Sequence, residues 1–184
     1  MTGVDDVTVR VMAPHEFEAM RAVSVAAFGN DASIGHLLDG LRDSWAWHDE
    51  LSFVAVRGDE VVAQVLYSSA IVDAPGRLVQ VLVLSPVGVA PHLQRSGVGT
   101  KLITQSLAVL DARDEPLVFL EGSPSYYPRF GFRPGAELGF TAPSVRIPPP
   151  AFMVRPLPRY EPWMTGALVY PDVFWRFDAV GLRP

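Results

Sequence analysis

The first part of the chain contains three runs in which hydrophobic residues predict strands. Residues 7–11 alternate β-branched and polar side chains, which is the period of a half-buried strand. Residues 51–57 and 61–72 are two further runs, and the tight turn Gly58-Asp59-Glu60 lies between them. This arrangement indicates a β-hairpin.

Between the first two strands the hydrophobic positions recur at helical spacing. Pro14 begins one helical pattern, and a shorter helix is predicted for residues 33–42. The positions expected to face inward are Phe17, Met20, Ser24, Ala27 and Phe28 in the first helix, and Ile34, Leu37, Leu38 and Leu41 in the second.

Residues 77–121 are predicted to form a strand, a helix and a second strand. Residues 77–89 are so rich in Val and Leu that both faces of this fourth strand should be covered. Pro86 cannot donate a ladder hydrogen bond, so we expect a bulge or a local separation there. A helix over 97–113 followed by a fifth strand over 116–121 predicts two parallel neighbouring strands. The inward helix positions would be Val98, Leu102, Ile103, Val109 and Leu110.

The last third of the chain is rich in proline. Ser123 is expected to cap a short helix that ends at Phe130-Gly131-Phe132. Residues 141–163 are predicted to be mostly extended or looped. A closing strand is predicted for 167–170 and a last packed turn for 173–177.

Size and composition indicate one globular domain. The chain has 184 residues, of which 49% are hydrophobic and 19% charged, enough for a substantial core. No repeat or boundary is found, so a single domain spanning residues 1–184 is predicted. The absence of Cys excludes disulfides, Cys-ligated metals and thiol catalysis. The four His residues lack the spacing of a metal site, and no metal is expected.

Charge and hydropathy predict a cytoplasmic protein with neither a nucleic-acid nor a membrane partner. The formal net charge is −5, with fourteen Arg and one Lys, which is not the basic footprint of a nucleic-acid binder. The densest apolar stretch, residues 79–90, is interrupted and too short to span a membrane. The acidic first residues show no secretory signal.

The strongest chemical signal is a glycine-rich turn after the fourth strand, which reads Gln94-Arg-Ser-Gly97-Val-Gly99-Thr100. The first N–H groups of a helix have no partner within it and carry the positive end of its dipole. Glycines let an anion approach the backbone, and Arg95 can add a charged contact. The turn is suited to phosphate, although a plain connection capped by glycines has the same pattern. The P-loop and dinucleotide-binding patterns are not met.

This stretch resembles motif A of the GCN5-related N-acetyltransferases, the GNAT family. Val89-Ala-Pro91-His-Leu-Gln94-Arg-Ser-Gly97-Val-Gly99 is similar to V-x-P-x-x followed by [QR]-x-x-G-x-[GA]. Tyr127-Pro-Arg-Phe-Gly131-Phe132 resembles the family's Y-x-x-x-G-F segment, and residues 119–134 resemble a bacterial branch of predicted acetyltransferases. The resemblance covers residues 5–140. It implies an α/β fold with a mixed, mostly antiparallel twisted sheet, flanking helices, and a splayed parallel pair formed by the fourth and fifth strands.

The resemblance implies acetyl-CoA as the acetyl donor. Main-chain amides of residues 95–100 would bind the pyrophosphate, and the pantetheine arm would pair with the fourth strand and enter between the splayed strands. The cofactor-binding residues so implied are Val87, Val89, Gln94, Arg95, Ser96, Gly97, Val98, Gly99, Thr100 and Ser123. Ser123 stands near a position where the family frequently has Asn.

Tyr127 falls where the family often carries its general acid. A phenol can protonate a departing thiolate, or Tyr127 can belong simply to an aromatic cluster. The fourth strand has no carboxylate to act as general base. Glu121 and Ser85, the latter through an ordered water, are the candidates, and Glu121 can equally be a solvated charge at a strand end.

The predicted function is N-acetyl transfer to an amine of a small molecule or peptide, by direct attack in a ternary complex. The alternative is a non-catalytic acyl-CoA-binding or regulatory protein, which the missing carboxylate favours. A serine hydrolase is disfavoured because no G-x-S-x-G sequence is present. Trp45 and Trp47 either line the acceptor pocket or pack in the core. The segment 141–184 either completes the acceptor side or buries the face of a homodimer.

Overall fold

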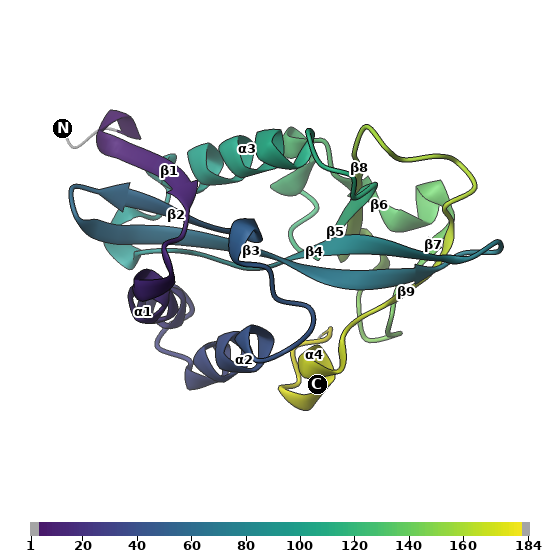
Figure 1. Cartoon of the computed structure of the whole chain (residues 1–184), viewed down its shortest axis with the longest axis horizontal. Helices are drawn as coiled ribbons and strands as arrows, with labels where there is room; N and C mark the ends of the chain where they lie inside the picture. Colours follow the sequence, from purple (N-terminus) through teal and green to yellow (C-terminus); the bar gives the residue numbers. More distant parts are fainter. Residues whose placement is uncertain (1–3, 182–184) are drawn as a thin grey trace. The chain divides into compact units, whose positions relative to one another are not determined.

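A computed structural model describes residues 4–181 (Figure 1). The described chain forms two compact units. Among the described residues, one unit comprises residues 4–67 and 85–109, and the other comprises residues 68–84 and 110–181. Strands β3 (Glu60–Asp73) and β4 (Leu78–Val89) contribute residues to both units. That residues 1–184 form a single domain stays a prediction.

The first unit contains an antiparallel ladder. Strand β1 (Val7–Val11) pairs with β2 (Ser52–Arg57), and β2 pairs with β3 through the predicted hairpin. The end of β4 joins β3, because the Ala90 N–H donates to the Val62 carbonyl at 2.9 Å. The three strands predicted in this region are therefore confirmed, to within one residue at each end.

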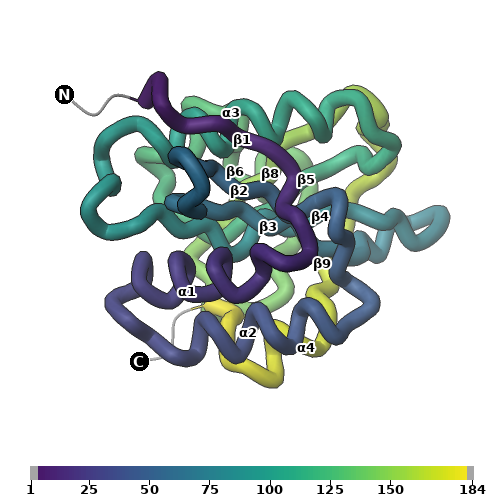
Figure 2. The backbone as a smooth tube through the Cα atoms, turned by 60° about the vertical axis from the view of Figure 1, so that its left-hand side comes forward, coloured from purple at the N-terminus to yellow at the C-terminus, as the bar shows by residue number. Residues whose placement is uncertain are grey.

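Helices cover both faces of this ladder. Helices α1 (Phe17–Ala27) and α2 (Ala32–Arg42) lie on one face, and α3 (Val98–Leu110) lies on the opposite face (Figures 1 and 2). Asp31 is the N-cap of helix α2, and its carboxylate accepts the Ser33 N–H at 2.9 Å. On the α3 face, the hydroxyls of Tyr67 and Ser106 share a buried hydrogen bond of 2.7 Å.

Two of the predicted inward positions are wrong. Phe28 is 46% exposed, because it follows the last residue of α1 and its backbone is no longer helical. Val109 is 47% exposed, because it lies at the edge of the arc that buries the other predicted positions of α3. The predicted positions that are buried are Phe17, Met20, Ser24, Leu37, Leu38, Leu41, Val98, Leu102, Ile103 and Leu110.

The second unit is built around β5 (Leu117–Glu121). This strand runs parallel to β4, and β8 (Phe152–Pro156) runs antiparallel along its whole length. The remaining short strands are β6 (Arg133–Pro134), β7 (Phe140–Thr141) and β9 (Gly166–Val169). The ladder order is β1-β2-β3-β4-β5-β8-β6, with β9 on β3 and β7 on β9. The predicted mixed, mostly antiparallel α/β fold with a parallel β4/β5 pair is confirmed.

The proline-rich region is more ordered than its sequence suggests. Strand β8 lies within residues 141–163, which were predicted to be extended or looped, and Pro156 ends it without interrupting the pairing. The short helix predicted after Ser123 is a 3₁₀ turn, and Gly131 ends it at φ +85°. Helix α4 (Asp172–Arg176) takes the place of the last packed turn. The 3₁₀ turns are Val4–Asp6, Pro14–Glu16, Asp49–Leu51, Pro91–Leu93, Tyr127–Phe130, Gly135–Leu138 and Pro149–Ala151.

The only lysine in the sequence fastens the amino-terminal segment to α3. Lys101 Nζ donates to the Val4 carbonyl at 3.1 Å and to the Val7 carbonyl at 2.6 Å. Hydrogen bonds from a charged donor are stronger than neutral ones. We expect this half-buried ammonium to stabilise the edge of the first unit.

Lys101→Met should lower the free energy of unfolding by about 1.5–3 kcal/mol, because it removes a charged donor from two carbonyls. Urea denaturation measures the change. Arg176→Met is the matched control, since Arg176 pairs with Asp172 on the exposed surface of α4 and such pairs contribute under about 1 kcal/mol. Equal losses in the two variants would contradict the role given to Lys101.

Candidate active site

The turn between β4 and α3 has a backbone that an anion can approach. Arg95 has φ +62° and Gly97 has φ +97°, so two of its residues take left-handed conformations. Residues 94–97 are exposed, and α3 begins at Val98. The first N–H groups of α3 have no partner within the helix, which leaves them for a ligand.

Two side chains of the turn bond to the protein's own main chain. Gln94 Nε2 donates to the carbonyls of Val89 at 3.2 Å and Ala27 at 3.4 Å. Ser96 donates twice to the Leu93 carbonyl, from its hydroxyl at 2.6 Å and from its N–H at 3.3 Å. These contacts close the turn. Among residues 95–100, the Ser96 N–H is thus already used, and the amides on either side of it are the better candidates for a phosphate.

The left-handed backbone at position 97 and the nearby Val4 side chain both favour glycine at this position. A left-handed φ is rarely adopted by residues with a Cβ. A Cβ built on Gly97 would lie 3.0 Å from Cγ2 of Val4, in the amino-terminal segment that Lys101 fastens. The amino-terminal segment therefore packs directly against the turn.

The end of β4 is exposed on alternate residues. Ser85, Val87 and Val89 are half-buried, whereas Pro86 and Gly88 are buried. The peptide bond between Ser85 and Pro86 is cis. Within the described residues, the parallel register of β4 with β5 consists of Leu82↔Val118 and Val83↔Phe119, so it stops before Ser85.

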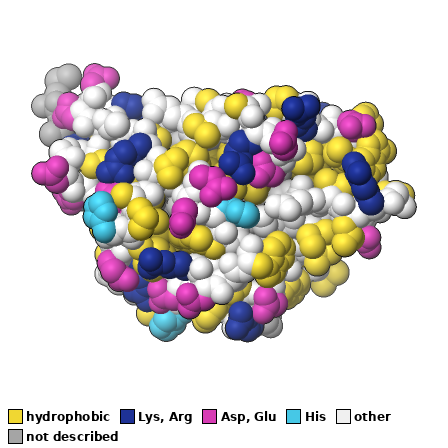
Figure 3. Space-filling model, viewed as in Figure 1, with side chains coloured by type: hydrophobic (Ala, Val, Ile, Leu, Met, Phe, Trp, Pro, Cys, Tyr) yellow, Lys and Arg dark blue, Asp and Glu magenta, His cyan; other side chains and the backbone are white. Residues whose placement is uncertain are grey.

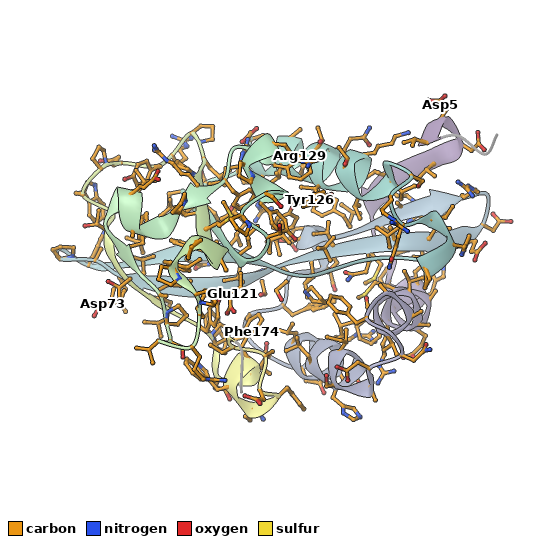
Figure 4. All side chains as sticks on the ribbon, turned by 180° about the vertical axis from the view of Figure 1, so that it is seen from behind. Asp5, Asp73, Glu121, Tyr126, Arg129 and Phe174 are labelled. Carbon is orange, nitrogen blue, oxygen red and sulfur yellow. The ribbon has the colours of Figure 1, made fainter. Side chains whose placement is uncertain are left out.

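Glu121 fastens the carboxyl-terminal segment to the end of β5. Its Oε1 accepts the Tyr170 hydroxyl at 3.1 Å, and its Oε2 accepts the Gly181 N–H at 2.9 Å. Figure 4 labels Glu121 of β5 and Phe174 of α4. Burial raises the pKa of the Glu121 carboxyl above its usual value, although the Gly181 N–H, the Tyr170 hydroxyl and Arg146 each act to lower it. Both oxygens of the predicted base therefore already have partners.

Tyr127 lies in an aromatic cluster. Its ring meets those of Tyr126 at 5.1 Å and Phe132 at 5.9 Å, both edge to face. Burial, with a smaller effect of Tyr126, raises the pKa of the Tyr127 phenol to about 12. The Arg129 guanidinium covers the Tyr126 ring at 4.7 Å (Figure 4). Ser123 is exposed on the same segment and shares a hydrogen bond with the Ser125 hydroxyl.

The tryptophans fall into packed and exposed groups. Trp47 meets Phe17 of α1 edge to face at 5.8 Å, and its Nε1 donates to Asp49. Trp45 and Trp175 are 56% and 42% exposed. Trp47 therefore packs against α1, and whether Trp45 or Trp47 lines an acceptor pocket stays a prediction.

Charges are intermixed on the surface drawn in Figure 3, where basic and acidic side chains alternate over the described residues. In the part of the chain that the structure describes, no three His, Asp or Glu side chains are grouped so that they could hold a metal ion. None of the helices within residues 4–181 combines the length and the apolar character needed to cross a bilayer.

A family model described as an acetyltransferase (GNAT) domain matches residues 8–135. The chain belongs to the GNAT acetyltransferase family. It is 31% identical over 125 residues to the uncharacterized N-acetyltransferase YjhQ of Escherichia coli, covering 67% of this chain and 68% of YjhQ.

Two solved GNAT structures are similar over nearly the whole chain. The GNAT family N-acetyltransferase YhbS from E. coli, in complex with CoA, matches with a TM-score of 0.82, 24% identity, and coverage of 97% of this chain and 96% of YhbS. A GNAT family acetyltransferase from Brucella melitensis, in complex with acetyl-CoA, matches with a TM-score of 0.72, 27% identity, and coverage of 91% and 97%.

The GNAT family match covers most of the residues considered for the site. It includes the turn, Glu121 and Tyr127, whereas β8, β9 and α4 follow it in sequence. Sequence reasoning missed Gln64, a buried amide bonded to β4. Its signal was present as a single amide within the otherwise apolar run 61–67.

Glu121→Gln should make the stability less dependent on pH. Because the folded carboxyl has a pKa above its usual 4.5, the wild type binds this proton more tightly when folded and loses stability as the pH rises through that window. Gln keeps an acceptor for the Gly181 N–H and a donor for the Tyr170 oxygen. Relative to the wild type, the variant should therefore gain stability between pH 4 and pH 7, as measured by urea denaturation.

Glu121→Ala is the control, because it removes both acceptors together with the titrating carboxyl; it should cost about 2 kcal/mol at pH 4 and less at pH 7, parallel to Glu121→Gln but at lower stability. A constant difference between Glu121→Gln and the wild type from pH 4 to pH 7 would show that the carboxyl has an ordinary pKa.

Proposed function

We propose that this GNAT protein is an N-acetyltransferase that moves an acetyl group from acetyl-CoA to an amine of a small molecule or peptide. The observation that supports it most directly is the exposed turn at residues 94–97, left-handed at Arg95 and Gly97, which leads straight into α3. The presence of CoA or acetyl-CoA in the two similar structures supports the donor.

In this proposal the first unit binds the cofactor. The pyrophosphate lies on main-chain amides of residues 95–100, where the helix dipole and free N–H groups favour an anion. The pantetheine arm follows β4 at Val87 and Val89, whose half-buried side chains alternate with buried ones. Ser123 stays a predicted contact of the cofactor.

The proposed transfer needs no covalent enzyme intermediate. The acceptor nitrogen attacks the thioester carbon, so a C–N bond forms and the C–S bond breaks. Tyr127 gives its proton to the departing thiolate, and the acceptor nitrogen loses a proton to a base or to water. The Tyr127 phenol, whose pKa burial raises to about 12, is protonated at neutral pH as an acid must be, and the raised pKa makes transfer of that proton to the thiolate less favourable.

Glu121 and Ser85 remain the two proposed bases. The raised pKa of Glu121 favours it, since a base is most effective when its pKa is near the working pH. Its hydrogen bonds to Tyr170 and Gly181 act against it, because an amine would have to compete with both. Ser85 is half-buried on β4 and would act through a bound water.

A non-catalytic acyl-CoA-binding protein is the second candidate. The observation that favours it is the absence of any carboxylate from β4. Turnover separates the two candidates, whereas cofactor binding does not. A cytoplasmic location, the choice between a small-molecule and a peptide acceptor, and a homodimer stay predictions from the sequence.

Gly97→Ala should weaken CoA binding about 10-fold or more, because the turn must shift to relieve a strain of about 1–3 kcal/mol. Calorimetric titration with CoA measures the affinity. Gly139→Ala is the matched control, since Gly139 has φ +78° in the second unit and the same strain there should leave CoA affinity unchanged. Equal affinity in wild type and Gly97→Ala would remove the turn as the phosphate site.

Tyr127→Phe should lower turnover by about 10²- to 10⁴-fold without changing CoA affinity. No hydrogen bond to the Tyr127 hydroxyl is found among the described residues, so the fold should tolerate the change. Release of free thiol from acetyl-CoA is followed with polyamines, amino acids and aminoglycosides as acceptors.

Tyr126→Phe is the matched control and should keep turnover within about threefold of wild type. If Tyr127→Phe is as active as the wild type, the acid is another group. Thermal stabilisation of the wild type by acetyl-CoA, without thiol release on any amine, would favour the binding protein.

A further inference from the structure

Gln64 is a buried amide that uses only part of its hydrogen-bonding capacity. It lies in β3 opposite Val54 of β2, and none of its surface is exposed. Its Nε2 donates to the Pro86 carbonyl at 3.3 Å. Its Oε1 is buried and has no hydrogen-bond partner among the described residues.

Folding stability does not account for this residue. A buried amide oxygen without a partner costs free energy, because it has lost its water and gained no donor. An aliphatic side chain of similar size would fill the same space without that cost. Unpaired buried polar groups in native proteins call for an explanation other than packing.

The bond that Gln64 does make is to an irregular part of β4. Pro86 has no N–H and cannot donate to a neighbouring strand. Helix α1 lies close to Gly88, since a Cβ there would lie 3.1 Å from Cβ of Ala27 and 3.2 Å from Cα of Ser24. The same built Cβ would lie 3.7 Å from Gln64 Nε2. The backbone at residues 86–88 is therefore enclosed by α1 and by the Gln64 amide.

A second glutamine bonds to the other end of this stretch. Gln94 Nε2 donates to the Val89 carbonyl at 3.2 Å and to Ala27 at the end of α1. The carbonyls of Pro86 and Val89 thus both accept side-chain amides. The two bonds fix the main chain on either side of Val87 and Gly88.

We propose that Gln64 is a positioning residue, which fixes the β4 backbone at residues 86–89 so that the thioester of acetyl-CoA is aligned for attack. The alignment rests on the proposed function, which puts the pantetheine arm along this stretch. Gln64 acts through the Pro86 carbonyl and does not touch the cofactor. The unpaired Oε1 of Gln64 is the free-energy cost of placing the Nε2 donor beside the Pro86 carbonyl.

Gln64→Leu is the test. Amide hydrogen exchange at residues 87–90 of the free protein should become about 10-fold faster, because the Pro86 carbonyl loses its donor. The unfolding temperature should stay within about 3 °C of wild type, since the weak bond and the unpaired oxygen are lost together. The Kd for CoA should change less than threefold, while kcat falls about 10- to 100-fold through misalignment.

Two further variants sharpen the result. Gln80→Leu makes the same chemical change in β4, where the Gln80 amide donates to the Ser69 hydroxyl, and it should leave exchange at residues 87–90 and kcat unchanged. Gln64→His can still donate an N–H to the Pro86 carbonyl. It should therefore recover part of the exchange protection at residues 87–90 and part of kcat.

Unchanged exchange at residues 87–90 in Gln64→Leu would overturn the proposal whether or not the protein turns over. A fall in unfolding temperature of 10 °C or more would also overturn it, because Gln64 would then be a structural residue. If the wild type lacks turnover but exchange responds as expected, the backbone role stands and the proposed function fails.

Discussion

The main chain between β4 and α3 must leave strand pairing and begin a helix without burying unpaired polar groups. Pro86 removes one donor from β4, and side-chain amides of Gln64 and Gln94 bond to nearby carbonyls. The left-handed conformations of Arg95 and Gly97 then turn the chain into α3 within a few residues. The first amides of α3 are left without internal partners. The proposed cofactor site depends on the conformation of this stretch of backbone between β4 and α3.

In the second unit, the carboxyl-terminal segment around α4 contains little regular secondary structure. It is therefore held by side-chain contacts with the strands. Glu121 ends β5 and accepts hydrogen bonds from Tyr170 and from Gly181. One carboxylate thus joins the central strand to residues on both sides of α4. The same burial that makes the contact effective raises the pKa of Glu121. Glu121, which was predicted as a base, therefore also holds the carboxyl-terminal segment against β5.

Strands were predicted well where the local pattern was clear. The alternation of residues 7–11 and the tight turn at Gly58 are the two examples. The sequence did not single out β8, because prolines on either side of residues 152–155 indicated only a mostly extended or looped stretch. Motif spacing located the turn but could not reveal that the Ser96 N–H is used within it. The role of Gln64 was also hidden, because burial and an unpaired oxygen are properties of the folded chain.

Burial of Tyr127 in its aromatic cluster determines both how the ring packs and the pKa of its phenol. The sequence set an aromatic cluster against a general acid as alternatives. In the structure the neighbouring rings bury the phenol, and this burial raises its pKa to about 12. A phenol with so high a pKa stays protonated throughout the neutral range, so it can donate a proton but cannot serve as a base. The cluster thus keeps the phenol protonated, which the acid role requires, and at the same time makes its proton harder to release to a thiolate.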